Sequence, residues 1–185
     1  MKFFKKNIEN NYLIIGLGNP GKEYEKNRHN IGYMCIKYLK NLLNIDNIKI
    51  KYNNTIYEYK KNNKTKIILA KSHEYMNNSG DSIRNIVKFF KIINKKIIVI
   101  HDDIDLDFGI IKYKIGGGNA GHNGLKSIDN AIGNEYYRIR IGVGRPERKE
   151  MVSGYVLSNF KNEEILQFDD IFKKTHELIN EIISL

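Results

Sequence analysis

Short apolar runs alternate with helical patterns along this chain, and this alternation constrains its fold more than any other feature of the sequence. Residues 12–17 and 96–100 are mainly apolar and are followed by turn-forming residues, as buried strands are. Apolar residues at helical spacing in 30–43 and 162–184 predict amphipathic helices. Strands that alternate with helices favour an α/β fold with a twisted, mixed and largely parallel sheet flanked by helices. We expect a single globular domain over residues 1–185, a length that can bury one sizeable core.

The remaining predicted elements are shorter. We expect strands at 66–71, 110–115 and 137–143, helices at 81–90 and 125–132, and an edge strand or hairpin at 48–59 that turns at Asn53-Asn54. In the last helix, Asn162 is placed to cap the N-terminus, and Glu163 and Glu164 suit its first turn.

Cysteine usage and charge limit the class of protein. Cys35 is the only cysteine, so no internal disulfide and no Cys-based zinc site can form; its place on the apolar face of the 30–43 helix indicates a core residue. No run approaches the ~20 apolar residues of a membrane span, and residues 1–12 lack a signal-peptide core. We therefore expect a cytoplasmic protein without a membrane partner.

The formal charge of +10 would attract a polyanion such as nucleic acid. The same chain is rich in Lys, Asn, Ile and Tyr, the mixture that an AT-biased coding sequence produces without selection for binding. Charge alone therefore does not decide whether the partner is a nucleic acid.

Polar loops rich in Asn, His, Asp and Gly follow four of the predicted strands. They span residues 18–30, 72–80, 101–109 and 116–124. In open α/β sheets, ligands bind beyond the carboxyl ends of the strands. We therefore expect the four loops to converge on one site.

Two glycine-rich segments have the spacing of a dinucleotide-binding fingerprint, one formed by Gly16, Gly18 and Gly21 and another starting at Gly116. In the first, Pro20 removes a backbone N–H from the loop and the predicted helix starts several residues later. In the second, no acidic residue follows a further strand at the required distance. Neither segment therefore favours a nucleotide cofactor.

A calcium loop is excluded by two residues. Asp103, Asp105 and Asp107 alternate as calcium ligands do, but Phe108 stands where the loop needs glycine and Lys114 where it needs the last carboxylate.

Histidines and carboxylates leave two kinds of chemistry open. His29, His101 and His122 could supply transition-metal ligands, but no two have a chelating spacing on one helix, so we predict no metal and no cofactor. Metal-free acid–base chemistry remains, in which a buried carboxylate holds a histidine in one tautomer and the histidine activates water. We predict that His29 and Asp102 form this pair.

The setting of His29 distinguishes it from the other histidines. His101 ends a buried strand pattern and is expected to be structural, and we expect no catalytic role for His73 or His176. Neutral amides, which can bind an amide or carbonyl group as both donor and acceptor, are predicted to share a rim with His29. These amides are Asn19, Asn77, Asn78, Asn119 and Asn123.

The motifs of these loops resemble those of bacterial-type peptidyl-tRNA hydrolases. They occur in the order GLGNPG, NRHNIG, YMNNSG, HDDIDLDFG, GGGNAGHNGLKSI and RIRIGVGRP, with YVLSNF after them. One such motif would be weak evidence, whereas six in register over nearly the whole chain are specific. The fold that the resemblance implies, one α/β globule around a twisted mixed sheet, agrees with the predicted elements.

The resemblance implies an enzyme that hydrolyses the ester between a peptide and the 3′-terminal ribose of tRNA and so releases tRNA for reuse in translation. It implies that His29 is the general base that activates water, that Asp102 orients and polarises His29, and that Asn19 positions His29 or the terminal nucleotide. The partner would be peptidyl-tRNA, and one core suggests a monomer without an obligate protein partner. Further roles implied are peptide binding by Tyr24, Tyr75, Met76, Asn77 and Asn123, a mobile gate that includes Gly118 and His122, and tRNA binding by Lys112, Lys114 and Arg140.

The sequence argues against two rival functions. Some relatives with this fold are RNA-binding splicing factors, but the presence of His29, Asp102 and the amides favours an enzyme. A serine hydrolase of the α/β type would need a G-x-S-x-G motif, which the chain lacks.

Overall fold

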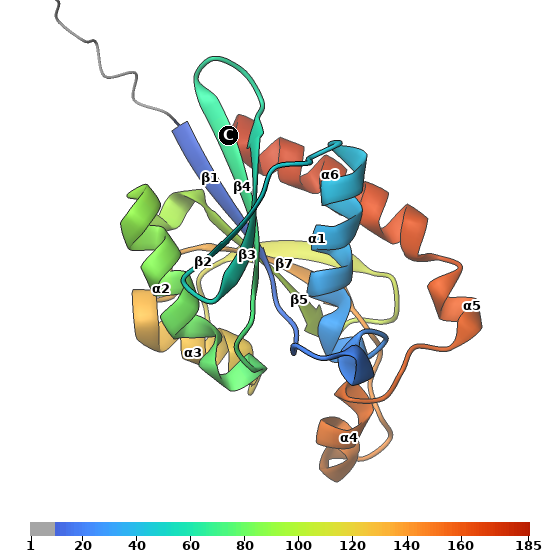
Figure 1. The fold of residues 1–185 in the computed structure, drawn as a ribbon. Helices are drawn as coiled ribbons and strands as arrows, with labels where there is room; N and C mark the ends of the chain where they lie inside the picture. The colour runs from blue at the N-terminus through green and yellow to red at the C-terminus, as the bar shows by residue number, and fades with distance from the viewer. Residues whose placement is uncertain (1–9) are drawn as a thin grey trace, which may run out of the picture.

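A seven-stranded mixed sheet forms the centre of the structure (Figure 1). The computed structural model describes residues 10–185; residues 1–9, on which part of the expectation about a signal peptide rests, lie outside it. The parallel strands are β1 (Asn10–Gly16), β4 (Thr65–Ser72), β5 (Ile97–Asp103) and β7 (Tyr137–Gly142), and the antiparallel ones are β2 (Ile48–Lys51), β3 (Asn54–Lys60) and β6 (Ile111–Ile115). The strand order is β2-β3-β4-β1-β5-β7-β6, which confirms the expected largely parallel α/β sheet.

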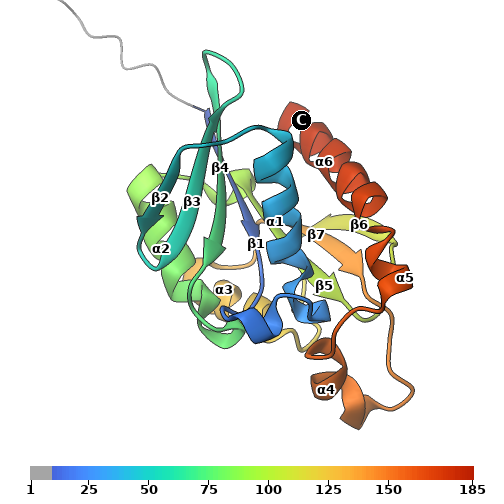
Figure 2. The same ribbon diagram turned by 45° about the vertical axis from the view of Figure 1, so that its right-hand side comes forward.

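Helices cover both faces of this sheet (Figure 2). α1 (Ile31–Leu42) and α6 (Phe168–Ser184) pack on one face, and α2 (Ser79–Phe90) and α3 (Asn123–Ile132) on the other. Successive side chains of a strand point to opposite faces of the sheet. In β1, Ile14 therefore packs in the core under α1 and α6, while its neighbours Leu13 and Ile15 pack in the core under α2 and α3. This two-sided burial explains why the central strands are continuous apolar runs.

Cys35 belongs to the core, as expected. It is fully buried on α1, and burial raises the pKa of its thiol. No helix within residues 10–185 combines the length and the hydropathy of a membrane span.

The predicted turn of the hairpin is wrong by one residue. Tyr52 and Asn53 have positive φ angles of 52° and 55°, as a tight two-residue hairpin turn requires. Asn54 is instead the first residue of β3 and is buried.

The last predicted helix has the expected ends, Asn162 and Ser184, but its predicted cap and its continuity are wrong. It is divided into α5 (Asn162–Ile165) and α6, and Lys161 rather than Asn162 is the capping residue of α5. Glu164 accounts for the local geometry, because its carboxylate accepts the Lys161 N–H at 2.6 Å and also binds Arg28 from the first loop. A short helix that the sequence did not predict, α4 (Val152–Val156), precedes this region.

The start of α1 brings the first loop onto the ends of the strands. Gly32 packs directly against the backbone of Leu17 and Ile100, so any side chain at this position would clash with them. The Tyr33 N–H donates to the Leu17 carbonyl at 3.1 Å, and the Leu17 N–H donates to the Ile100 carbonyl at 2.9 Å. The residues that precede α1 are therefore held beside the carboxyl end of β5.

Candidate active site

A cavity of about 710 Å³ lies at the carboxyl ends of the parallel strands. Its size falls within the range of ligand pockets, about 300–1,000 Å³. Residues of all four predicted loops line it, which confirms that the loops converge; among them are Asn19, His29, Met76, Asp102 and Asn119.

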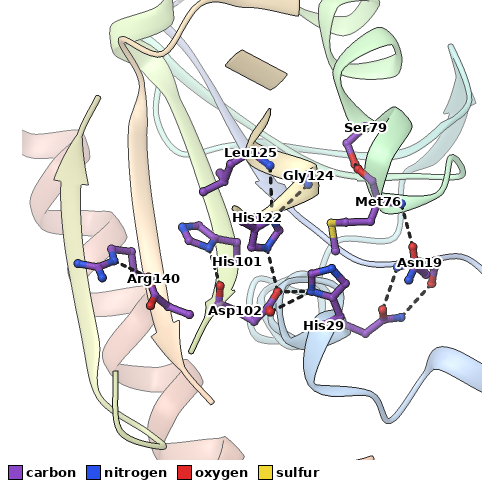
Figure 3. A network of polar contacts seen from close by, with 12 residues as sticks. Asn19, His29, Met76, Ser79, His101, Asp102, His122, Gly124, Leu125 and Arg140 are labelled. Carbon is purple, nitrogen blue, oxygen red and sulfur yellow. Dashed lines mark hydrogen bonds and ion pairs between the residues drawn. The ribbon is translucent and has the colours of Figure 1, made fainter. Parts of the chain in front are cut away.

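His29 and Asp102 form a hydrogen-bonded pair in this cavity (Figure 3). His29 Nδ1 lies 2.8 Å from Oδ1 and 2.9 Å from Oδ2 of Asp102. His29 stands on the single turn that precedes α1, and Asp102 is the buried penultimate residue of β5. When Nδ1–H donates to the carboxylate, the lone pair of the imidazole resides on Nε2, where a base could take a proton from water.

Charge and burial compete in setting the pKa values of this pair. Burial alone would lower the pKa of His29, but the charge of Asp102 and its hydrogen bond outweigh burial and raise this pKa above 6.5. Burial would raise the pKa of Asp102, but the nearby His29 and His122 hold it well below its usual range. Asp102 is therefore a carboxylate near neutral pH, and it makes His29 a stronger base.

His122 is a second partner of Asp102 that the sequence did not reveal. Its Nε2 lies 3.0 Å from Asp102 Oδ1. Its Nδ1 accepts the N–H groups of Gly124 at 3.1 Å and Leu125 at 3.4 Å, so His122 caps the N-terminus of α3. Because Nδ1 acts as an acceptor, His122 is neutral and carries its proton on Nε2, from which it donates to Asp102.

The fold also brings together a potential set of metal ligands, which the sequence spacing had not indicated. Ligand atoms of His29, Asp102 and His122 all lie within 4.8 Å of one another. A metal on Nε2 of His122 would require a proton on Nδ1, where the N–H groups of Gly124 and Leu125 already point. These contacts fit a carboxylate that accepts a hydrogen bond from each histidine better than they fit a metal centre.

His101 lies beside this group but is neutral. It is buried, and its Nδ1–H donates to the backbone carbonyl of Asp102 at 2.7 Å. Burial lowers its pKa well below the usual range of a histidine. Among the other histidines, His73 is exposed and His176 is partly buried on α6, both outside this cavity.

Asn19 links two of the loops. Its Oδ1 accepts the Met76 N–H at 2.8 Å, while its backbone N–H and C=O both bind the side-chain amide of Asn30 at 2.8 and 2.9 Å. Among residues 10–185, no hydrogen bond joins Asn19 to His29. Asn30, which the sequence analysis did not single out, thus holds Asn19 in place.

The residues predicted to bind the peptide all line the cavity. Tyr24 and Tyr75 form an edge-to-face contact with ring centroids 6.3 Å apart, next to Met76. Asn77 and Asn123 also line the cavity. Asn78 does not, which corrects its predicted place on the rim: it lies in an adjoining groove, because η3 (Met76–Asn78) turns it away toward α2.

The predicted tRNA-binding residues lie on one face of β6 and β7. Lys112 pairs with Arg140 across the antiparallel strands, and Lys114 pairs in the same way with Arg138, so all four side chains share a face. Lys114 and Arg140 line the cavity, whereas Lys112 is exposed beyond it. Burial and then the charges of the two arginines lower the pKa of Lys114. Asp103 is the partner of Arg140, with Nε and Oδ2 2.6 Å apart.

The glycine-rich loop is hydrogen-bonded to two of these cationic side chains. The backbone carbonyl of Gly118 accepts hydrogen bonds from Arg138 at 3.0 Å and from Lys114 at 3.3 Å. Arg138 is fully buried and forms an ion pair with Asp129 at 2.8 Å. Arg138 could not be singled out from the sequence, since nothing in its motif distinguishes it from the neighbouring Arg140.

Comparisons with known proteins agree with these observations. The family profile described as peptidyl-tRNA hydrolase matches residues 13–185. A peptidyl-tRNA hydrolase of Rickettsia canadensis is 50% identical over 173 residues, which cover 91% of this chain and 93% of the relative. That of Aliarcobacter butzleri is 46% identical over 164 residues, covering 89% of this chain and 87% of the relative.

A solved structure shows the same architecture. The crystal structure of peptidyl-tRNA hydrolase from Acinetobacter baumannii superposes with a TM-score of 0.82 and 36% identity, covering 90% of this chain and 85% of that one. The profile, the relatives and the shared fold together show that this chain belongs to the peptidyl-tRNA hydrolase family.

Proposed function

We propose that this chain hydrolyses the ester bond that joins a peptide to the 3′-terminal ribose of tRNA, with water as the nucleophile and without a metal. Family membership supports the substrate class and the type of reaction. The observation that carries the mechanism is the hydrogen bond from His29 Nδ1 to Asp102, which leaves Nε2 as the basic nitrogen.

In this mechanism His29 Nε2 takes a proton from water while the water oxygen attacks the ester carbonyl. The proton then passes from His29 to the ribose oxygen as the C–O bond breaks, which leaves a free carboxylic acid on the peptide and a hydroxyl on the tRNA. Asp102 stabilises the imidazolium that forms in between and fixes the orientation of the ring.

Neutral amides supply the rest of the chemistry. Asn77 and Asn123 line the cavity with amide groups that can donate to the carbonyl oxygen as negative charge develops on it. An ester is already activated, so a positioned base and such donors suffice without a covalent intermediate. Lys114 and Arg140, on the β6–β7 side, would bind phosphate groups of the tRNA.

One assay separates this proposal from its rivals. The purified protein is incubated with peptidyl-tRNA and with the corresponding aminoacyl-tRNA, each with and without EDTA. We expect the protein to cleave only peptidyl-tRNA, at a rate that EDTA does not change. Equal cleavage of both substrates would indicate a general esterase, loss of activity in EDTA a metalloenzyme, and binding without cleavage an RNA-binding module.

A further inference from the structure

A second cavity, of about 200 Å³, lies between α1, α6 and the sheet on which both helices pack. Leu39 of α1, Leu69 of β4 and Ile179 of α6 are among the side chains that line it. All three are buried members of the same hydrophobic core, so the inner part of the cavity is apolar. An engineered apolar cavity of about 150 Å³ binds benzene, and this cavity is therefore large enough for a small organic molecule.

This cavity is separate from the active site. Of the residues between 10 and 185, none lines both cavities. Ile67 lies near the amino end of β4, and Lys61 precedes that strand, whereas the active site lies at the carboxyl ends of the parallel strands. A ligand of the second cavity would therefore leave the active site open, and its binding does not depend on the proposed function.

Three polar side chains that line this cavity are hydrogen-bonded in a row. Lys61 Nζ donates to Asn180 Oδ1 at 2.9 Å, and Asn180 Nδ2 lies 3.0 Å from Nε2 of His176. Because an ammonium group can only donate, Lys61 fixes the orientation of the Asn180 amide, whose Nδ2–H then donates to His176. Burial and then the charge of Lys61 lower the pKa of His176. His176 is therefore neutral and carries its ring proton on Nδ1.

Lys61 is thus the charged side chain of this cavity. Its ammonium group binds the neutral Asn180 and forms no ion pair with a carboxylate of residues 10–185. Glu177, the neighbour of His176, is exposed and does not line the cavity. An ammonium group has three N–H donors, so donors of Lys61 remain for a ligand.

Apolar walls next to a cation without an anionic partner complement a molecule that has a hydrocarbon tail and an anionic head. A purely apolar ligand would make no use of the Lys61 donors, and a cation would be repelled by them. A polyanion such as RNA is excluded by the volume of the cavity. We propose that this cavity binds a small aliphatic carboxylate, with the carboxylate on Lys61 and the tail between α1 and α6.

Hexanoate is the probe for a first test on the full chain, with thermal unfolding and methyl NMR as the measurements. A ligand that binds only the folded state raises Tm. We expect millimolar hexanoate to raise Tm and to shift the methyl signals of Leu39, Leu43 and Ile179, while the Met76 methyl in the active-site cavity stays unchanged. The uncharged analogue hexanol should bind more weakly. The absence of these methyl shifts, or equal binding of the two probes, would overturn the inference.

A matched pair of variants tests the position of the carboxylate. Lys61→Met removes the charge and keeps most of the hydrocarbon stem, and Lys60→Met, at an exposed position on β3 outside the cavity, is its control. We expect Lys61→Met to weaken hexanoate binding about tenfold, which corresponds to the loss of a hydrogen bond to a charged group, and to leave hexanol binding unchanged. Lys60→Met should affect neither probe. Equal hexanoate affinity in the two variants would show that Lys61 does not bind the carboxylate.

A second pair tests the position of the tail. Leu43→Phe places a ring in the cavity from the C-terminal end of α1, where Leu43 is only partly buried, and should abolish the binding of both probes. Leu42→Phe, exposed on α1 and outside the cavity, should bind both as the wild type does. Circular dichroism without ligand shows whether each variant folds. Undiminished binding in folded Leu43→Phe would place the ligand elsewhere and overturn the inference, and the Lys61 pair tests it independently of this variant.

Discussion

Arg28 and Glu164 form an ion pair although 136 residues separate them along the chain, with Nη2 of Arg28 2.9 and 2.8 Å from the two carboxylate oxygens. The guanidinium of Arg28 also lies over the ring of Tyr155, 4.7 Å from its centroid, and donates to the backbone carbonyl of Asn159. Arg28 immediately precedes His29, the proposed base, on the same turn. The contacts of Arg28 therefore hold this turn against the segment from α4 to α5.

Breaking this pair should therefore affect both stability and turnover. Arg28→Ala leaves Glu164 without its buried partner, and we expect the free energy of unfolding in urea to fall by about 3 kcal/mol. Glu164→Gln keeps an oxygen acceptor and should cost less. In both variants kcat should fall more than KM rises, because His29 loses its orientation; full activity in Arg28→Ala would show that the turn holds its shape without the pair.

His29→Ala should remove the base while the protein stays folded, because His29 lies at the edge of the cavity and not in a hydrophobic core. We expect the rate of peptide release to fall by about a hundredfold or more. Circular dichroism provides the folding control, and near-normal turnover would disprove the mechanism.

Asp102→Asn should move the pH profile toward acid. His29 must be neutral to act as a base, so kcat/KM should fall as the pH drops through its pKa, which Asp102 holds above 6.5. Without that charge, burial remains and lowers the pKa, so the acid limb should shift to lower pH while the plateau rate also falls. An unchanged acid limb would mean that the group seen in the profile is not His29.

His122 has two roles that a pair of variants can separate. His122→Ala removes both the cap of α3 and the hydrogen bond to Asp102, and should cost about 1 kcal/mol in unfolding free energy. His122→Asn supplies a capping oxygen on a shorter side chain. We expect it to have the wild-type free energy of unfolding but not the wild-type rate of peptide release. Recovery of both would assign His122 to capping alone.

Lys114 and Arg140 should govern the salt dependence of substrate binding. Replacing either with Ala should raise KM and reduce the slope of log KM against log salt by about one. Lys37→Ala, at an exposed position on α1, is the control and should leave the slope as it is. A wild-type slope in both test variants would exclude these residues from phosphate binding.

The features that could be predicted from the sequence are those that local pattern determines. Apolar runs indicated the parallel strands, and polar residues just after them indicated one shared site, where His29 and Asp102 indeed meet. Contacts that depend on tertiary packing have no comparable pattern in the sequence. The bonds of Arg28 to Glu164 and of His122 to Asp102 join residues with no fixed spacing, and α4 is too short to show helical periodicity.

Gly32 has no side chain to contribute to chemistry, yet its position constrains the chemistry as strictly as a functional group does. Because the backbone of Leu17 and Ile100 occupies the space where its Cβ would be, replacement by alanine would push α1, and His29 with it, away from β5. Catalysis in this scaffold therefore depends on position 32 having no side chain. A redesign that preserved every polar group but filled this space would keep the reactive residues and lose their alignment.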